Sequence, residues 1–79
     1  MKQALQLTFP QNLIKEPVIH KMTEKYDVVF NLRRARITEK IGEIVLELEG
    51  EEKVLSQAIQ WLKDQGLKVE PVTRDTLES

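Results

Sequence analysis

The stretch Asp27–Gly50, DVVFNLRRARITEKIGEIVLELEG, decides the fold of this chain. It begins with a β-rich run over 28–38, which we predict to be one long strand. Residues 39–42 then turn the chain, and Gly42 suits a turn because glycine tolerates a positive φ. The return strand alternates between two sets of residues, as is typical of a strand with one buried face. The first set is Ile44, Leu46 and Leu48, and the second is Val45, Glu47 and Glu49.

The segments on either side of this hairpin complete the pattern. Residues 2–9 alternate like a half-buried strand, and a helix follows from Pro17, which suits a first helical turn, to about Tyr26. After the hairpin, apolar residues at helical spacing predict a second helix that starts at Gly50 and ends at Gly66. A last strand over 67–71 is cut short by its proline.

The order of elements is therefore β-α-β-β-α-β, which predicts an α+β fold of the ferredoxin-like type. In this two-layer sandwich, two helices pack on one face of a four-stranded antiparallel sheet. We expect one domain over residues 1–73 and a polar C-terminal tail over 74–79.

The length and the cysteine count limit how this domain is stabilised. A core built from 79 residues supplies only about 3–5 kcal/mol, so small domains usually add a staple or a partner. The chain has no cysteine and one histidine, which excludes disulfides, thiolate metal sites, iron–sulfur clusters and histidine-rich metal clusters. We therefore expect no metal and no cofactor, and oligomerisation remains as a way to bury more surface.

The composition also excludes several kinds of partner. Lysine and arginine number 12 against 13 acidic residues, which argues against a broad basic surface for nucleic acid. No apolar run approaches the roughly 20 residues of a membrane span, so no membrane insertion is expected. The N-terminus has no apolar signal-peptide core, and we expect a cytoplasmic protein without a targeting segment.

The strand at 28–38 does not alternate cleanly. Phe30 and Leu32 share one parity with Val28, whereas Val29, Ala35 and Ile37 have the other. A strand that is apolar on both faces is normally covered on both, but a two-layer sandwich covers only one. Either a bulge changes the register near Arg33 and Arg34, or a second copy covers the strand, or the edge is mobile. The pattern favours the second copy, with a dimer interface formed by Val28, Phe30 and Leu32.

Residues that could carry catalysis are missing. RNA-binding modules with this strand order stack bases on aromatic residues, but the strand at 42–49 is acidic and has none. No arginine precedes Arg33, so the first loop cannot be an arginine-bearing phosphate loop. The three glycines are too dispersed for a glycine-rich phosphate loop. We expect no catalytic residues and no enzymatic activity.

Polar residues in the 28–38 strand are the remaining candidates for a site. Asn31 is a poor strand former, so it either occupies an edge or bulge position or binds the carboxylate and ammonium of an amino acid. Arginines at 33, 34 and 36 face the glutamates at 43, 47 and 49 across the hairpin. They form either surface ion pairs or a carboxylate site. We interpret His20 as a surface residue and Trp61 as a core residue.

Several pieces in order resemble the NIL domain, a small regulatory module at the C-terminus of the ATPase subunits of methionine-type ABC transporters that also occurs in ferredoxin-related proteins. The pieces are Phe9-Pro10, Glu16-Pro17-Val18-Ile19, Asp27-Val28-Val29-Phe30-Asn31-Leu32 with Ala35, Glu47-Leu48-Glu49-Gly50, Ala58-Ile59-Gln60-Trp61-Leu62 and Leu67-Lys68-Val69-Glu70. The resemblance implies a module that pairs with its twin and binds methionine at the interface, with Asn31 at the motif asparagine. Leu32 replaces the motif isoleucine and Arg33 replaces the motif leucine, and the chain has no ATPase nucleotide loop.

Two functions follow from these observations. The first is a stand-alone regulatory homodimer that binds methionine or a related amino acid through Phe30, Asn31, Leu32 and Arg33. The second is a protein–protein interaction module that uses the same strand to dock on an unknown protein, with no ligand.

Overall fold

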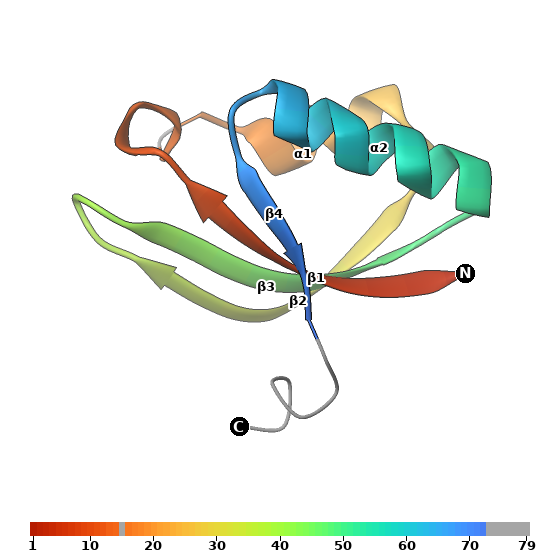
Figure 1. Ribbon diagram of the computed structural model, residues 1–79, viewed down its shortest axis with the longest axis horizontal. Helices are drawn as coiled ribbons and strands as arrows, with labels where there is room; N and C mark the ends of the chain where they lie inside the picture. Colours follow the sequence, from red (N-terminus) through yellow and green to blue (C-terminus); the bar gives the residue numbers. More distant parts are fainter. Residues whose placement is uncertain (15, 73–79) are drawn as a thin grey trace.

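Two helices lie over one face of a four-stranded sheet in the computed structural model, which describes residues 1–14 and 16–72 (Figure 1). The strand order is β2-β3-β1-β4, and all neighbouring strands are antiparallel. The predicted α+β ferredoxin-like fold is confirmed. In chain order the elements are β1 (Lys2–Phe9), the 3₁₀-helix η1 (Gln11–Leu13), α1 (Val18–Lys25), β2 (Val29–Ile37), β3 (Gly42–Glu49), α2 (Glu52–Asp64) and β4 (Lys68–Pro71).

Both helices begin one residue later than predicted from the sequence. Pro17 is the N-cap of α1 rather than its first helical residue. The N-cap of α2 is Glu51, one residue later than the predicted Gly50. Residues 73–79, which hold the predicted tail and the last residue of the predicted domain, lie outside the described residues. No helix in the described part of the chain is long and apolar enough to cross a membrane.

The core lies between the helices and the two central strands. Alternate residues of β1 and β3 point toward the helices and are buried, as their period-two pattern predicts. Buried residues of α1 and α2 fill the other side of the same core. The core residues are Leu5, Leu7, Phe9, Val18, Met22, Val28, Leu46, Leu48, Leu55, Ala58, Leu62 and Leu67. Trp61 is half-buried against this cluster and meets the ring of Tyr26 edge-on, with 6.4 Å between the ring centroids.

A β-bulge interrupts the pairing of β2 with β3. Leu32 is opposite Leu46, and Arg34 is opposite the next residue of β3, Val45, so Arg33 has no partner of its own. A bulge of this kind inserts one residue and shifts the side-chain alternation of the strand by one. Ala35 therefore faces the same side of the sheet as Leu32.

The bulge explains the irregular pattern of this strand in the sequence. Phe30 and Leu32 before the bulge, and Ala35 and Ile37 after it, all face the helix side, because their partners in β3 do. On the opposite, open face of the sheet only Val29 remains as a large apolar residue of β2. The bulge expected as one alternative is therefore present, and the strand is apolar on one face rather than two.

The C-terminus of α2 has the geometry that its sequence predicts. Gly66 has a φ of 103°. Its N–H donates to the Lys63 carbonyl at 3.0 Å, and the N–H of Leu67 donates to the Leu62 carbonyl at 3.3 Å. These two hydrogen bonds form a Schellman motif, in which buried Leu62 and Leu67 supply the usual apolar contact.

Replacing Gly66 with alanine is expected to lower the free energy of unfolding by about 1–2 kcal/mol, because an L-residue is strained at this positive φ. Urea denaturation measures the change. Gln65→Ala is the matched control, since Gln65 has an ordinary helical φ of −73°. Equal effects of the two substitutions would contradict the role given to the glycine.

Candidate functional site

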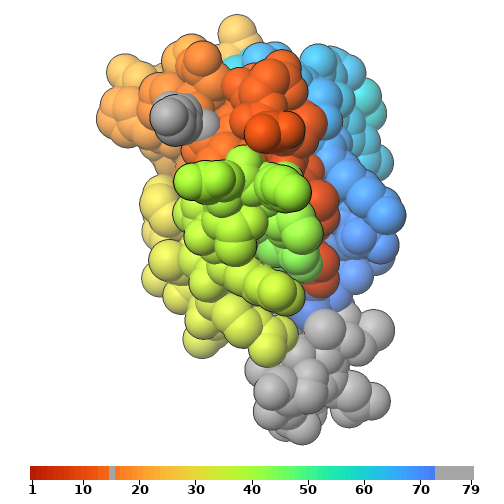
Figure 2. Space-filling view, turned by 90° about the vertical axis from the view of Figure 1, so that its left-hand side faces the viewer, coloured from red at the N-terminus to blue at the C-terminus, as the bar shows by residue number. Residues whose placement is uncertain are grey.

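The helix-facing side of β2 is left uncovered by the helices. Phe30, Leu32 and Ile37 are 40%, 57% and 59% exposed, although Leu48 and Leu46, the partners of the first two in β3, are fully buried. Because β2 is an edge strand of the described sheet, one side of its backbone also has no neighbouring strand among residues 1–14 and 16–72. Figure 2 shows the yellow-green atoms of β2 and of the hairpin at the surface of the molecule. This combination of exposed apolar side chains and an open backbone edge is called the β2 edge below.

The residues predicted to bind a ligand do not converge in the single chain. Phe30 and Leu32 face the helix side, whereas Asn31 is opposite Glu47 and faces the open side. Arg33, at the bulge, forms an ion pair with Glu47 at 3.2 Å. These four residues therefore do not form one shared site in the single chain.

Val28 occupies a different place from the one expected of an interface residue. It is only 7% exposed and belongs to the core, just before the start of β2. Its side chain is therefore not available to a partner. Phe30 and Leu32, the other two predicted interface residues, are exposed on the β2 edge.

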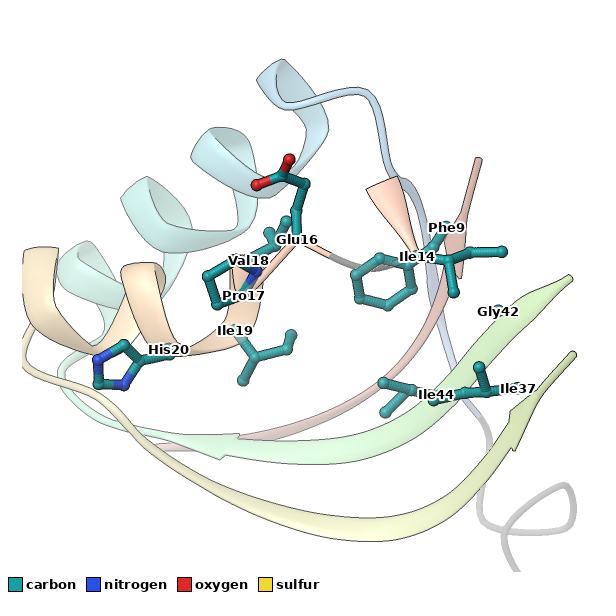
Figure 3. Close-up of a pocket in the computed structure, with 10 residues that line it drawn as sticks. All are labelled: Phe9, Ile14, Glu16, Pro17, Val18, Ile19, His20, Ile37, Gly42 and Ile44. Atoms are coloured by element: carbon teal, nitrogen blue, oxygen red, sulfur yellow. The ribbon is translucent and has the colours of Figure 1, made fainter. Parts of the chain in front are cut away.

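An apolar cavity opens beside the β2 edge. Its volume is about 180 Å³, and it lies between the segment that leads into α1 and the hairpin end of the sheet (Figure 3). Glu16 and His20 are its charged or polar side chains. The apolar part of the lining comes from Phe9, Ile14, Pro17, Val18, Ile19, Ile37, Gly42 and Ile44. Ile37 belongs both to this cavity and to the β2 edge, so the two features are continuous.

Gly42 lines this cavity at a point where a side chain would not fit without displacing its neighbours. A Cβ atom on Gly42 would lie 3.2 Å from Phe9 Cβ and 3.3 Å from Ile14 Cγ1. Among the described residues only Gly66 has a positive φ, so the predicted role of Gly42 as a left-handed turn residue is wrong. The sequence marks the glycine, but only the packing shows why it is there.

Gly42→Ala is expected to destabilise the fold by about 1–3 kcal/mol, because the added methyl group overpacks the contact with Phe9 and Ile14. Thermal unfolding followed by circular dichroism measures the effect. The neighbouring Ile41, which is 42% exposed, provides a control as Ile41→Ala. A smaller effect of Gly42→Ala than of Ile41→Ala would contradict the packing role.

The open face of the sheet carries a second, polar hollow. Its volume is about 210 Å³, and its lining consists of Gln6, Arg34, Arg36, Glu43 and Val45. Gln6 Nε2 donates to Glu43 Oε2 at 3.2 Å, and Arg36 is opposite Glu43 in the strand register. The arginines of the bulge region could bind a carboxylate here, although Glu43 offsets part of their charge.

The expected ion pairs across the hairpin are present in part. Arg33 meets Glu47, as the alternation predicts, but Glu49 meets Lys2 of β1 at 3.6 Å instead of an arginine. Exposed pairs of this kind contribute about 0–1 kcal/mol each. His20 is exposed and lies 3.2 Å from Glu24 on the same helix, in agreement with its interpretation as a surface residue.

The fold and the comparison with known proteins place the chain in a family. The strand order and the two helices define a ferredoxin-like α+β sandwich. Residues 3–71 match the model of the NIL domain, and the chain belongs to the NIL domain family.

Two curated relatives and one solved structure resemble this chain. It is 33% identical over 67 residues to methionine import ATP-binding protein MetN 2 of Acinetobacter baylyi, covering 80% of this chain and 20% of that protein. It is 30% identical over 77 residues to methionine import ATP-binding protein MetN 4 of Oceanobacillus iheyensis, covering 92% of this chain and 22% of that protein. The chain thus spans about a fifth of the length of these relatives. The crystal structure of the C-terminal domain of an ABC transporter ATP-binding protein from Enterococcus faecalis has the same fold, with a TM-score of 0.80 and 22% identity. The match covers 91% of this chain and 84% of that one.

Proposed function

We propose that this chain is a non-catalytic regulatory domain that pairs with a second copy and binds methionine or a related amino acid. The observation that carries the proposal is the β2 edge, where Phe30, Leu32 and Ile37 are 40%, 57% and 59% exposed on an edge strand. Monomeric proteins usually protect such an edge, and pairing with a second copy is one way to cover it. The methionine import proteins among the relatives support the choice of ligand.

The ligand site in this proposal lies along the same edge. Asn31 offers an amide that can donate to a carboxylate and accept from an ammonium group. Phe30 and Leu32 offer apolar surface to the ligand side chain, and Arg33 offers a positive charge near the carboxylate. Asn31 faces the opposite side of the sheet from Phe30 and Leu32. The proposal therefore assigns the polar contacts to the open face and the apolar contacts to the helix-facing side, and a second chain adds its own residues to each.

Sedimentation velocity with and without millimolar methionine tests this proposal. We expect a dimer that methionine strengthens. Phe30→Asp should shift the protein to monomer, because it places a charge in the apolar row. Val29→Asp is the matched control, since Val29 is 59% exposed on the other face of the same strand. A monomer at every concentration, with or without methionine, would falsify the proposal.

The open backbone of β2 also favours a second candidate, a protein-interaction module. An exposed edge strand accepts an extended segment of another protein by adding it to the sheet. Such a module would bind a partner protein with no amino acid present. Binding that is lost in Phe30→Asp but kept in Asn31→Ala would favour this candidate over the amino-acid sensor.

A further inference from the structure

We infer that two copies of this chain pair β2 with β2 in one particular antiparallel register, with the two-fold axis between Arg33 and Arg34. In this register Phe30 of the partner subunit lies opposite Ile37, against the apolar cavity. The inference rests on the homodimer proposed above and adds its geometry. The occupant of the β2 edge is thus a second copy, and that copy supplies a residue to the wall of the cavity.

The bulge determines which residues of β2 face the helices. Before the bulge these are Phe30 and Leu32, and after it they are Ala35 and Ile37. Leu32 and Ala35 are equally far in sequence from the point between Arg33 and Arg34, and so are Phe30 and Ile37. The helix-facing residues are therefore arranged symmetrically about that point.

In an antiparallel pair, residues directly opposite each other face the same side of the sheet. An axis between Arg33 and Arg34 places Leu32 opposite the partner's Ala35, and Phe30 opposite the partner's Ile37. On the open face, Asn31 is then opposite the partner's Arg36. In each of these pairs the two side chains lie on the same face of the sheet. The backbone N–H and C=O groups of the two residues also point the same way relative to the partner strand, because their direction alternates along a strand together with the side chains.

Other registers match over a shorter length. If Asn31 were opposite the partner's Asn31, opposite side chains would lie on the same face only over residues 29–33. Ala35 and Ile37 would then have no residue of the partner strand opposite them. If the axis passed through Arg33 itself, Phe30 would lie opposite the partner's Arg36, on the wrong face. Only the axis between Arg33 and Arg34 pairs the whole helix-facing row of β2.

This register brings the partner to the cavity. Ile37 lines the cavity, and the Cβ atoms of directly opposite residues lie about 4.5–5.5 Å apart. The ring of the partner's Phe30 therefore lies against the Ile37 side of the cavity, and the dimer has two such cavities. Near the axis Arg33 lies beside the partner's Arg34, and the ion pair of Arg33 with Glu47 at 3.2 Å offsets part of the repulsion.

Cysteine cross-linking tests the register, since the chain has no cysteine of its own. Leu32→Cys and Ala35→Cys are made as separate proteins, mixed, and oxidised with and without millimolar methionine. Directly opposite Cα atoms lie about 4.5–5.5 Å apart, within the range of a disulfide. We expect a covalent dimer in the mixture and none in either protein alone. In a dimer of one variant, each cysteine lies three positions along the strand, about 10 Å, from the same cysteine of the other chain.

A second pair, Asn31→Cys mixed with Arg36→Cys, repeats the test on the open face in case one substitution disturbs the strand. Asn31→Cys alone reports the competing register, in which it would cross-link with itself. The register is wrong if the protein sediments as a dimer and Asn31→Cys cross-links with itself, or if neither mixture cross-links. The proposed homodimer is unaffected by either of these results. A monomer at every concentration overturns both.

Discussion

Leu46→Ala is expected to lower the free energy of unfolding by about 2–5 kcal/mol, the range for removing a buried leucine side chain from a packed core. Leu46 lies in the centre of β3 and is fully buried between the sheet and the helices. A single core of this size supplies only about 3–5 kcal/mol of net stability. The substitution should therefore leave much of the protein unfolded at room temperature, as urea denaturation followed by tryptophan fluorescence will show through Trp61.

Leu32→Ala is the matched control for this prediction. Leu32 is directly opposite Leu46 and faces the same side of the sheet, but it is 57% exposed. The same substitution there should cost within about 0.5 kcal/mol in dilute protein, as for most surface positions. Similar losses at the two positions would mean that the helices cover β2 after all.

Saturating methionine is expected to raise the melting temperature by more than about 10 °C. A ligand at one hundred times its Kd adds about 2.7 kcal/mol of stability by mass action. In a domain of this size each kcal/mol raises the melting temperature by about 4–8 °C. A thermal-shift panel of all twenty amino acids measures the effect and shows which side chain the site prefers.

Asn31→Ala should abolish this shift while leaving the melting temperature of the free protein nearly unchanged. Asn12→Ala is the matched control, because Asn12 is an exposed asparagine on η1, away from β2. A shift with Asn31→Ala as large as with the original chain would remove this residue from the site. If none of the twenty amino acids stabilises the original chain, the amino-acid sensor is ruled out and the interaction module remains.

The architecture could be predicted from the sequence because its signals are local. The alternation of Ile44, Leu46 and Leu48 identifies a strand and its buried face without reference to the rest of the chain. The glycine at 66 follows a helical apolar stripe, and it takes the positive φ that ends the helix. Element order then leaves few possible topologies, and the observed order β2-β3-β1-β4 is that of the ferredoxin-like type.

The details of β2 could not be predicted with the same certainty. A bulge at Arg33 depends on the pairing with β3, so the sequence showed only a broken alternation, which favoured a partner over the bulge that the structure contains. The burial of Val28 depends on where β2 begins, because a residue just before the strand can turn into the core. The sequence does not determine either feature locally.

The apolar cavity could not be predicted either. Its walls come from β1, the segment leading into α1, and both strands of the hairpin, so it exists only in the folded chain. Nothing in the sequence showed that Ile14 would meet Phe9 and Gly42. The space that a missing side chain leaves at Gly42 becomes visible only when its neighbours are in place.

The bulge at Arg33 has a consequence for solubility. An edge strand rich in valine, phenylalanine, leucine and isoleucine is a template on which chains can stack without limit into fibres. Because Arg33 offsets the alternation of β2 halfway along, a regular strand from another protein matches only half of it. The three arginines of β2 also repel an unordered stack of copies. The bulge that shifts the alternation of β2 in one chain thus also limits the stacking of this strand with unrelated strands.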